Sequence, residues 1–156
     1  MEQLALQAVT QENWLATLAL EVEPDQQRFV ADYTPIAAIA LAKAYIRPGG
    51  AQWEPYAIYA GPLLVGFVEL AYTPQSVDDY WIFHFFIDHR FQGQGYGKAA
   101  LAAFIAFMRE RHPVCATLQL VVHPENHRAR QLYINAGFRP TGATRWGEPV
   151  YRLALH

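Results

Sequence analysis

The stretch that most constrains this chain is the apolar segment Tyr80 to Ile87, which runs into a glycine-rich turn and then into a helical pattern. Gly93, Gly95 and Gly97 form the turn. After it, apolar residues recur at positions i, i+3, i+4 and i+7, the spacing of one helix face. These residues are Leu101, Phe104, Ile105 and Met108. The pattern predicts a strand, a tight turn and a helix, and hence an α/β fold.

A junction of this kind suits a bound diphosphate, because the first N–H groups of a helix lack partners and glycine lets a ligand approach the backbone. Two common nucleotide motifs do not fit. The P-loop needs a glycine where Gln92 stands and a hydroxyl where Ala99 stands. The dinucleotide motif would place its third glycine on Lys98, and residues 115–122 contain no acid for a ribose. A tight turn that needs glycine only for its backbone angles is the alternative.

The composition limits the class of protein. A chain of 156 residues predicts one domain, 1–156, and 53% hydrophobic against 17% charged residues excludes disorder. A net charge of −2 gives no general attraction to nucleic acid. The single Cys115 cannot form an internal disulfide. Because the sequence shows neither a signal peptide nor a membrane-spanning run, we expect a cytoplasmic protein without a membrane partner.

The remaining elements alternate along the chain. Alternating or β-branched segments predict strands at 4–8, 57–60, 63–72 and 117–122, and two more after Phe138. Helices are expected from a Thr10 cap to Pro24, from Thr34 to about Tyr45, from the glycine turn to Pro113, and from an Asn126 cap to Gly137. This order predicts a mixed sheet with helices on both faces.

Three acidic residues gather in the loop Glu21 to Asp25. Such a loop is most simply a solvated turn. Its functional interpretation is one wall of a site for a cationic amine.

Two motifs together resemble one enzyme family. Gln92, Gly95 and Gly97 satisfy the pattern Gln/Arg-x-x-Gly-x-Gly/Ala, which is similar to the acetyl-coenzyme A loop of the GCN5-related N-acetyltransferase (GNAT) family. The segment from Asn126 to Phe138 matches the second family pattern, N-x-x-A-x-x-L-Y-x-x-x-G-F, at every defined position. The chain looks most like the bacterial spermine/spermidine acetyltransferases and their relatives.

The resemblance implies a mostly antiparallel mixed sheet with a splayed central strand pair, and acetyl-coenzyme A as cosubstrate. The glycine turn would hold the diphosphate, the splayed strands would expose backbone groups to the pantetheine arm, and an asparagine and a tyrosine would contact that arm and the sulfur. The implied cofactor-binding residues are Phe86, Ile87, Gln92, Gly93, Gln94, Gly95, Tyr96, Gly97, Lys98, Asn126 and Tyr133.

Three residues are candidates for catalysis. By resemblance, Tyr133 would protonate the departing thiolate; core packing is the alternative for a tyrosine on an apolar helix face. Deprotonating an amine of pKa about 10.4 at pH 7 costs about 4.6 kcal/mol, so the site also needs a base, a water relay or an apolar environment that lowers the amine pKa. Polyamine acetyltransferases often carry an acid before the glycine loop, but this chain has Phe83 followed by His84 there. His84 and Glu69 are therefore the candidate bases, and each has a structural alternative: a core histidine on the face of Ile82 and Phe86, or a carboxylate with a buried partner.

The expected reaction is direct attack of a primary amine of a small molecule on acetyl-coenzyme A, with a polyamine favoured. Acetylation of a protein N-terminus, a lysine, an amino acid or an aminoglycoside is the alternative, and so is a regulatory domain that binds coenzyme A without catalysis. No metal is expected, because Pro124 separates His123 from His127 and spoils a helical ligand pair. A homodimer is what similar proteins suggest.

Overall fold

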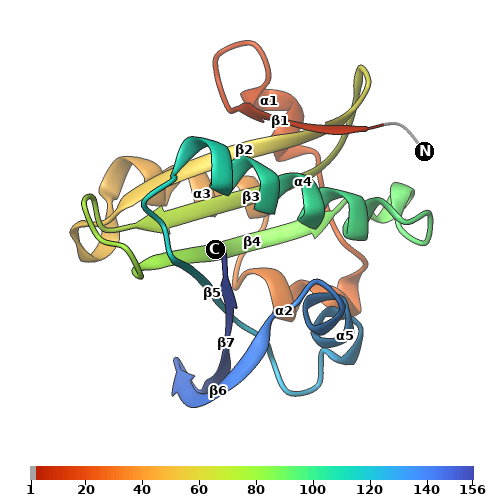
Figure 1. The fold of residues 1–156 in the computed structure, drawn as a ribbon. Helices are drawn as coiled ribbons and strands as arrows, with labels where there is room; N and C mark the ends of the chain where they lie inside the picture. The colour runs from red at the N-terminus through yellow and green to blue at the C-terminus, as the bar shows by residue number, and fades with distance from the viewer. Residues whose placement is uncertain (1–2) are drawn as a thin grey trace.

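The computed structural model describes residues 3–156. Its seven strands form one sheet in the order β1-β2-β3-β4-β5-β7-β6 (Figure 1). Every neighbouring pair is antiparallel except β4 and β5, which are parallel. The strands are β1 (Leu4–Ala8), β2 (Gln52–Ala60), β3 (Leu63–Tyr72), β4 (Tyr80–Ile87), β5 (Thr117–Val121), β6 (Arg139–Arg145) and β7 (Glu148–Ala154). The expected mixed, mostly antiparallel α/β fold is confirmed.

Helices cover both faces of the sheet, as the alternation of element types predicts. The helices are α1 (Trp14–Leu18), α2 (Gln27–Val30), α3 (Ile36–Ile46), α4 (Tyr96–Arg111) and α5 (His127–Asn135), with 3-10 turns at Pro24–Gln26, Pro48–Gly50 and His89–Phe91. On one face, Phe104 and Met108 of α4 pack with Leu70 of β3. On the other face, Ile36 of α3 packs with Phe67 of β3. Since successive strand residues point to opposite faces, β3 serves both cores.

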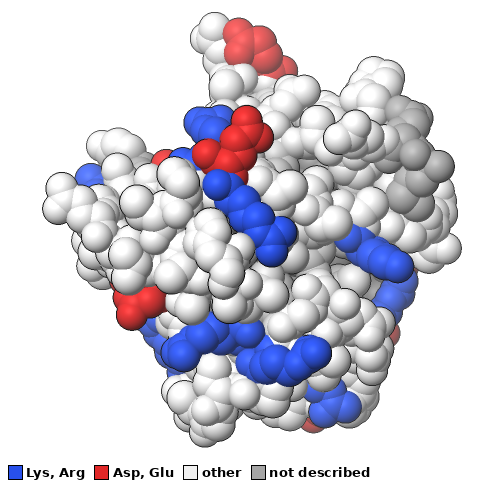
Figure 2. Space-filling view, viewed as in Figure 1, with Lys and Arg blue, Asp and Glu red and all other residues white. Residues whose placement is uncertain are grey.

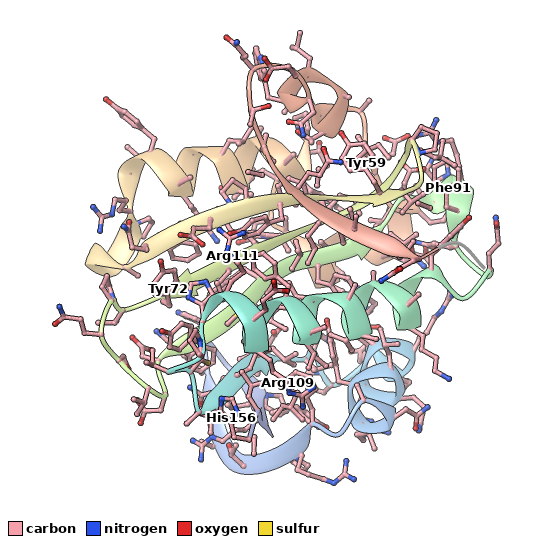
Figure 3. All side chains as sticks on the ribbon, turned by 45° about the horizontal axis from the view of Figure 1, so that its top comes forward. Tyr59, Tyr72, Phe91, Arg109, Arg111 and His156 are labelled. Atoms are coloured by element: carbon pink, nitrogen blue, oxygen red, sulfur yellow. The ribbon has the colours of Figure 1, made fainter. Side chains whose placement is uncertain are left out.

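The two ends of α4 are held differently. Arg109 and Arg111 lie in its last turn, where positive charge complements the helix dipole. Figure 3 shows Arg109 on the side of the C-terminal His156. Arg109 Nε donates to the Leu155 carbonyl at 3.0 Å and ties this end to the chain after β7. The first turn, in contrast, begins at Gly95 with no side-chain cap.

Strands β4 and β5 splay apart. They share a single register pair, Trp81 with Gln119, whereas β5 and β7 share five from Thr117 to Val121. Beyond Trp81, therefore, the facing edges of β4 and β5 are not paired with each other. The splayed central pair implied by the resemblance is confirmed.

A β-bulge interrupts β4 at His84. Glu69 of β3 pairs with Phe83, but Phe67 pairs with Phe86, so two residues of β4 stand opposite Val68 alone. His84 takes a positive φ of 53°, as one residue of a bulge can. The bulge breaks the alternation. Ile82 packs in the core under α4, whereas Phe86 packs in the core under α3, the helix whose Lys43 contacts His84. The expectation that His84 shares a face with Ile82 and Phe86 is therefore wrong for Ile82.

The N-terminal segment differs most from expectation. One helix was expected from a Thr10 cap to Pro24, but α1 spans only Trp14–Leu18 with Asn13 at its N-cap position, and Pro24 begins a 3-10 turn that leads into α2. The Thr10 hydroxyl instead accepts from the Glu12 amide at 3.3 Å, a local turn that competes with helix capping. Strand β2 also starts five residues before the predicted Ala57, at Gln52.

No helix within residues 3–156 is long and apolar enough to cross a membrane.

Candidate active site

A cavity of about 400 Å³ opens where β4 and β5 separate. Its walls come from the segment before and including α2, from the end of β4, from the glycine turn and from α5. The lining residues are Val22, Gln26, Phe29, Val30, Phe85, Phe86, Ile87, Gln92, Gly93, Gly95, Gly97, Lys98, Asn126, Arg128, Ala129, Gln131, Leu132 and Tyr133. The structure thus brings nine of the eleven predicted cofactor residues to one cavity; Gln94 and Tyr96 lie in the same turn but do not line it.

The part of this cavity at the start of α4 has the donors that an anion site needs. Gly95 sits at the N-cap of α4 with φ 84°, a backbone conformation that favours glycine, and no side chain caps the helix. The first-turn N–H groups and the helix dipole therefore face a ligand. Lys98 and Arg128 add positive charge to the lining. In Figure 2, basic side chains predominate over the lower half of the face shown, although the net charge is −2. This donor set fits a diphosphate.

Tyr133, on α5, also lines the cavity. Its side chain is buried, packed 5.6 Å from Phe138 and 6.4 Å from Phe85 between ring centroids. Its hydroxyl makes no hydrogen bond to any residue in 3–156, and burial raises its pKa above the ordinary value. At neutral pH, a tyrosine in this state holds its proton and can donate it.

Asn126 occupies the N-cap of α5, as predicted. Its Oδ1 accepts from the Ala129 amide at 3.3 Å. The capping bond uses the side-chain oxygen and leaves the amide NH₂ without a protein partner among residues 3–156. Because Asn126 also lines the cavity, that NH₂ group is a donor available to a ligand.

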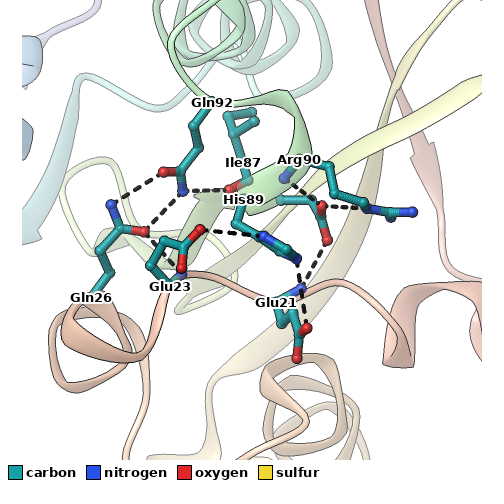
Figure 4. Close-up of polar contacts among 8 residues, drawn as sticks. Glu21, Glu23, Gln26, Ile87, His89, Arg90 and Gln92 are labelled. Atoms are coloured by element: carbon teal, nitrogen blue, oxygen red, sulfur yellow. Dashed lines mark hydrogen bonds and ion pairs between the residues drawn. The ribbon is translucent and has the colours of Figure 1, made fainter.

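The acidic loop is attached to the glycine turn (Figure 4). Two of its acids flank His89, in the 3-10 turn just before the glycine turn: His89 lies 3.6 Å from Glu21 and 3.4 Å from Glu23, nitrogen to carboxylate oxygen. Gln26 and Gln92 form a reciprocal amide pair of 3.1 and 3.0 Å. Gln92 Nε2 also donates to the Ile87 carbonyl at 2.9 Å. The loop therefore positions the turn that precedes α4, which neither interpretation of its charges had anticipated.

The C-terminal end of the segment 21–30 contacts the loop that follows β5, on the other side of the gap between β4 and β5. Arg28 pairs with Glu125 at 3.1 Å between exposed side chains, and the Phe29 ring lies 5.1 Å from the His123 ring. Residues 21–30 thus bridge from the glycine turn to the loop after β5. Gln26, Phe29 and Val30 line the cavity but were missed, because a four-residue helix carries no periodicity from which to predict it.

A smaller cavity of about 80 Å³ adjoins the first, and Phe85, Asn126 and Tyr133 border both. His84 lines the smaller one. The geometry fixes the His84 tautomer: Nδ1 lies 2.8 Å from the Val30 carbonyl and must donate, so Nε2 accepts from Lys43 Nζ at 2.9 Å. Burial and the Lys43 charge lower the His84 pKa to about 4.

Glu69 lies on β3 opposite Phe83 and lines neither cavity. It is fully buried, and neither carboxylate oxygen has a hydrogen-bond partner. Burial raises its pKa to about 8, against the opposing effect of Lys43. The structural partner that sequence reasoning offered for this carboxylate is not present among residues 3–156.

An acceptor cleft that binds a cation through cation–π contacts needs aromatic walls, and the sequence offers Trp14, Trp53, Tyr80 and Trp81 for them, with core packing as the alternative. Tyr80 is buried in the core, and Trp14 is exposed on α1. Trp53 and Trp81 belong instead to a run of rings on the α3 side of the sheet, Trp53–Phe83–Trp146–Trp81, with centroid spacings of 4.9, 5.5 and 6.0 Å. Within the described residues, no group of three His, Cys, Asp or Glu side chains is placed to hold a metal.

Known proteins share this arrangement. The sequence model of the Acetyltransferase (GNAT) family matches residues 5–138. A spermine/spermidine N(1)-acetyltransferase from Bacillus subtilis is 31% identical over 142 residues, with 88% of each chain covered.

Solved structures agree in fold. A spermidine N-acetyltransferase from Vibrio cholerae, in complex with CoA and spermine, aligns at TM-score 0.71 and 17% identity, covering 96% of this chain and 93% of that one. An acetyltransferase from Salmonella typhimurium that modifies the N-terminal serine of a ribosomal subunit protein aligns at TM-score 0.74 and 18% identity, covering 99% and 96%. The chain therefore belongs to the GNAT family and is an acetyl-coenzyme A-dependent N-acetyltransferase.

Proposed function

We propose that the protein transfers the acetyl group of acetyl-coenzyme A directly to a primary amine of a small molecule, with a polyamine as acceptor. One observation carries the transfer: a single cavity is lined both by the uncapped N-terminus of α4 and by the buried, proton-holding Tyr133. A polyamine is supported by the Bacillus subtilis relative, whose name gives spermine and spermidine as substrates.

Each part of the cofactor has a counterpart in the cavity. The backbone from Gln92 to Lys98 receives the diphosphate, and the Asn126 amide donates to the pantetheine arm. Unpaired backbone N–H groups near the β4 bulge stabilise the oxyanion of the tetrahedral intermediate. Tyr133 then protonates the departing thiolate. No covalent enzyme intermediate is needed.

Removal of the amine proton follows a less direct route. His84 borders the small cavity, but its Nε2 lone pair already accepts from Lys43, and a pKa of about 4 makes it a weak base. Glu69 has a suitable pKa of about 8 but lines neither cavity. We therefore favour burial of the amine together with a water relay. If His84→Ala or Glu69→Gln abolishes the fall of kcat/KM at low pH that protonation of a catalytic base causes, that residue is the base instead.

The test is thiol release from acetyl-coenzyme A across an amine panel of spermidine, spermine, a lysine peptide and an aminoglycoside. We expect the highest kcat/KM with a polyamine. Preference for the peptide or the aminoglycoside would reassign the acceptor. Cofactor binding without release from any acceptor would favour the regulatory alternative. A homodimer and a cytoplasmic location stay predictions.

A further inference from the structure

The Lys43 ammonium lies inside a cage that resembles a ligand site. From α3, its Nζ reaches 2.9 Å from His84 Nε2. The same atom lies 5.0 Å from the ring centroids of both Trp53 and Phe83. Two aromatic faces and an imidazole lone pair converge on one cation, which is the arrangement by which proteins bind alkyl ammonium groups.

The cage also has a buried acid that nothing else in the described chain explains. Glu69 stands directly opposite Phe83 in the β3–β4 ladder, next to the cage wall. Its carboxylate is fully buried with both oxygens unpartnered, a costly state for an acid. The Lys43 charge acts on it in the stabilising direction, but the two groups are too far apart for an ion pair within 4.0 Å.

The cage does not stabilise the charge of Lys43 well. Burial lowers its pKa, so the cage disfavours its charged form even though Glu69 and Asp32 oppose this. None of the described carboxylates pairs with it. Its side chain is only half-buried, and its helix neighbour Ala42 is exposed. A lysine on such a helix face can extend into water, where its charge is hydrated and its rotamers are free.

The cage lies next to the small cavity, and His84 borders both. His84 lines the small cavity beside Tyr133 and holds the Val30 carbonyl through Nδ1, while Nε2 points into the cage. One imidazole ring therefore separates the cage from the cavity where the amine and the thioester would meet. A molecule with two ammonium groups can place one on each side of that ring.

We propose that this cage, built from Trp53, Phe83, His84 and Glu69, binds the second, non-reacting ammonium group of a diamine or polyamine acceptor, and that Lys43 competes with it. The proposal rests on the proposed function and adds the site that recognises the acceptor. A monoamine leaves Lys43 in place. A diamine must displace Lys43 toward solvent, so Lys43 lowers the affinity for the acceptors that the cage would otherwise favour.

Removing the competitor tests this directly. In Lys43→Met, we expect the ratio of kcat/KM for cadaverine to kcat/KM for pentylamine, two amines that differ by the second amino group, to rise about fivefold or more. The ratio cancels any general effect of the substitution on His84. In Arg111→Met, which removes a cation stacked on Phe107 away from the cage, the ratio should stay at the wild-type value.

Two further measurements complete the design. Adding Trp53→Leu to Lys43→Met should abolish the gain, because one cage wall is then lost. Equilibrium binding of cadaverine and pentylamine to the protein saturated with coenzyme A should show the same change in ratio, whether or not turnover occurs. Absence of turnover with every amine would reject the proposed function, whereas an unchanged or lower binding ratio in Lys43→Met would overturn the cage.

Discussion

Two buried residues hold protons more tightly than they would in water. Tyr133 and Glu69 both have raised pKa values, and in both cases burial is the leading cause. They differ in access, because Tyr133 borders both cavities and Glu69 borders neither. Tyr133 is therefore placed to give its proton to a ligand in the cavity. Glu69 is not, but its raised pKa links its protonation to the stability of the fold.

Tyr133→Phe should lower kcat by about a hundredfold or more, since the variant cannot protonate the departing thiolate. The affinity for acetyl-coenzyme A should change little, because the ring and its packing remain. Single-turnover kinetics, with cofactor binding measured separately, check both parts. Tyr151→Phe, a buried tyrosine outside the cavity, is the control. Wild-type single-turnover rates in Tyr133→Phe would remove Tyr133 from the acid role.

Glu69 should make the folded state less stable as the pH rises. In the window from its ordinary value of 4.5 to about 8, the unfolded chain has lost the Glu69 proton while the folded chain retains it. Raising the pH through that window therefore favours unfolding, by at most about 1.4 kcal/mol per pH unit. Urea unfolding of wild type and Glu69→Gln at several pH values measures this. From pH 5 to pH 8, the free energy of unfolding of the wild type should fall relative to that of Glu69→Gln. A difference between the two proteins that does not change with pH would contradict this expectation.

At the scale of elements, the contact between β3 and β4 near the cavity is closer than a side chain allows. A Cβ added to Gly66 would lie 2.6 Å from the Phe86 carbonyl oxygen and 2.9 Å from the Ile87 side chain. Backbone atoms in a paired strand cannot move aside cheaply. Gly66 therefore sets how near the end of β4, which lines the cavity, can approach β3.

Gly66→Ala should lower the free energy of unfolding by about 1–3 kcal/mol, the usual cost of overpacking. Gly97→Ala is the matched control, because its Cβ would meet Ile87 and Leu132 at an ordinary 3.9 Å and alanine favours a helix. Chemical denaturation of both variants measures the difference. Equal stability of the two variants would show that β3 and β4 can separate without cost.

The elements that sequence reasoning found are the long or motif-bearing ones. Strand β4, helix α4 and helix α5 are long enough to show a hydrophobic periodicity. Asn126 caps α5 with its own side chain, and Gly95 begins α4 in a backbone conformation that favours a residue without a side chain. What it missed depends on contacts between distant segments. The bulge at His84 is set by pairing with β3, and α2 is held by partners in the glycine turn and after β5. No local pattern encodes such partners.

At the scale of the whole molecule, the sheet consists of two parts, β1 to β4 and β5-β7-β6, that share one register pair. Residues 21–30 connect the two parts, because Gln26 bonds to Gln92 after β4 and Arg28 pairs with Glu125 after β5. The cavity has walls on both parts, since β4 contributes Phe86 and α5 contributes Tyr133. A ligand in it would therefore add contacts that span the splay.

Acetyl-coenzyme A should stabilise the protein against global unfolding, by about 2.7 kcal/mol at a concentration of one hundred times Kd. Thermal or urea unfolding with increasing cofactor measures the effect. Pantetheine at the same concentration should stabilise much less, because it lacks the diphosphate that the N-terminus of α4 receives. Equal stabilisation by the two compounds would contradict the placement of the diphosphate.

The splay also gives the sheet an edge in its interior. Backbone N–H and C=O groups inside a protein need partners, and the unpaired edge of a strand is a template for another extended chain. Past Trp81 and Gln119, β4 and β5 do not satisfy each other. The pantetheine arm is an extended chain with two amide groups. With the pantetheine arm placed as we propose, the cosubstrate would take the place of a missing strand, and that part of the sheet would be complete only while the cosubstrate is bound.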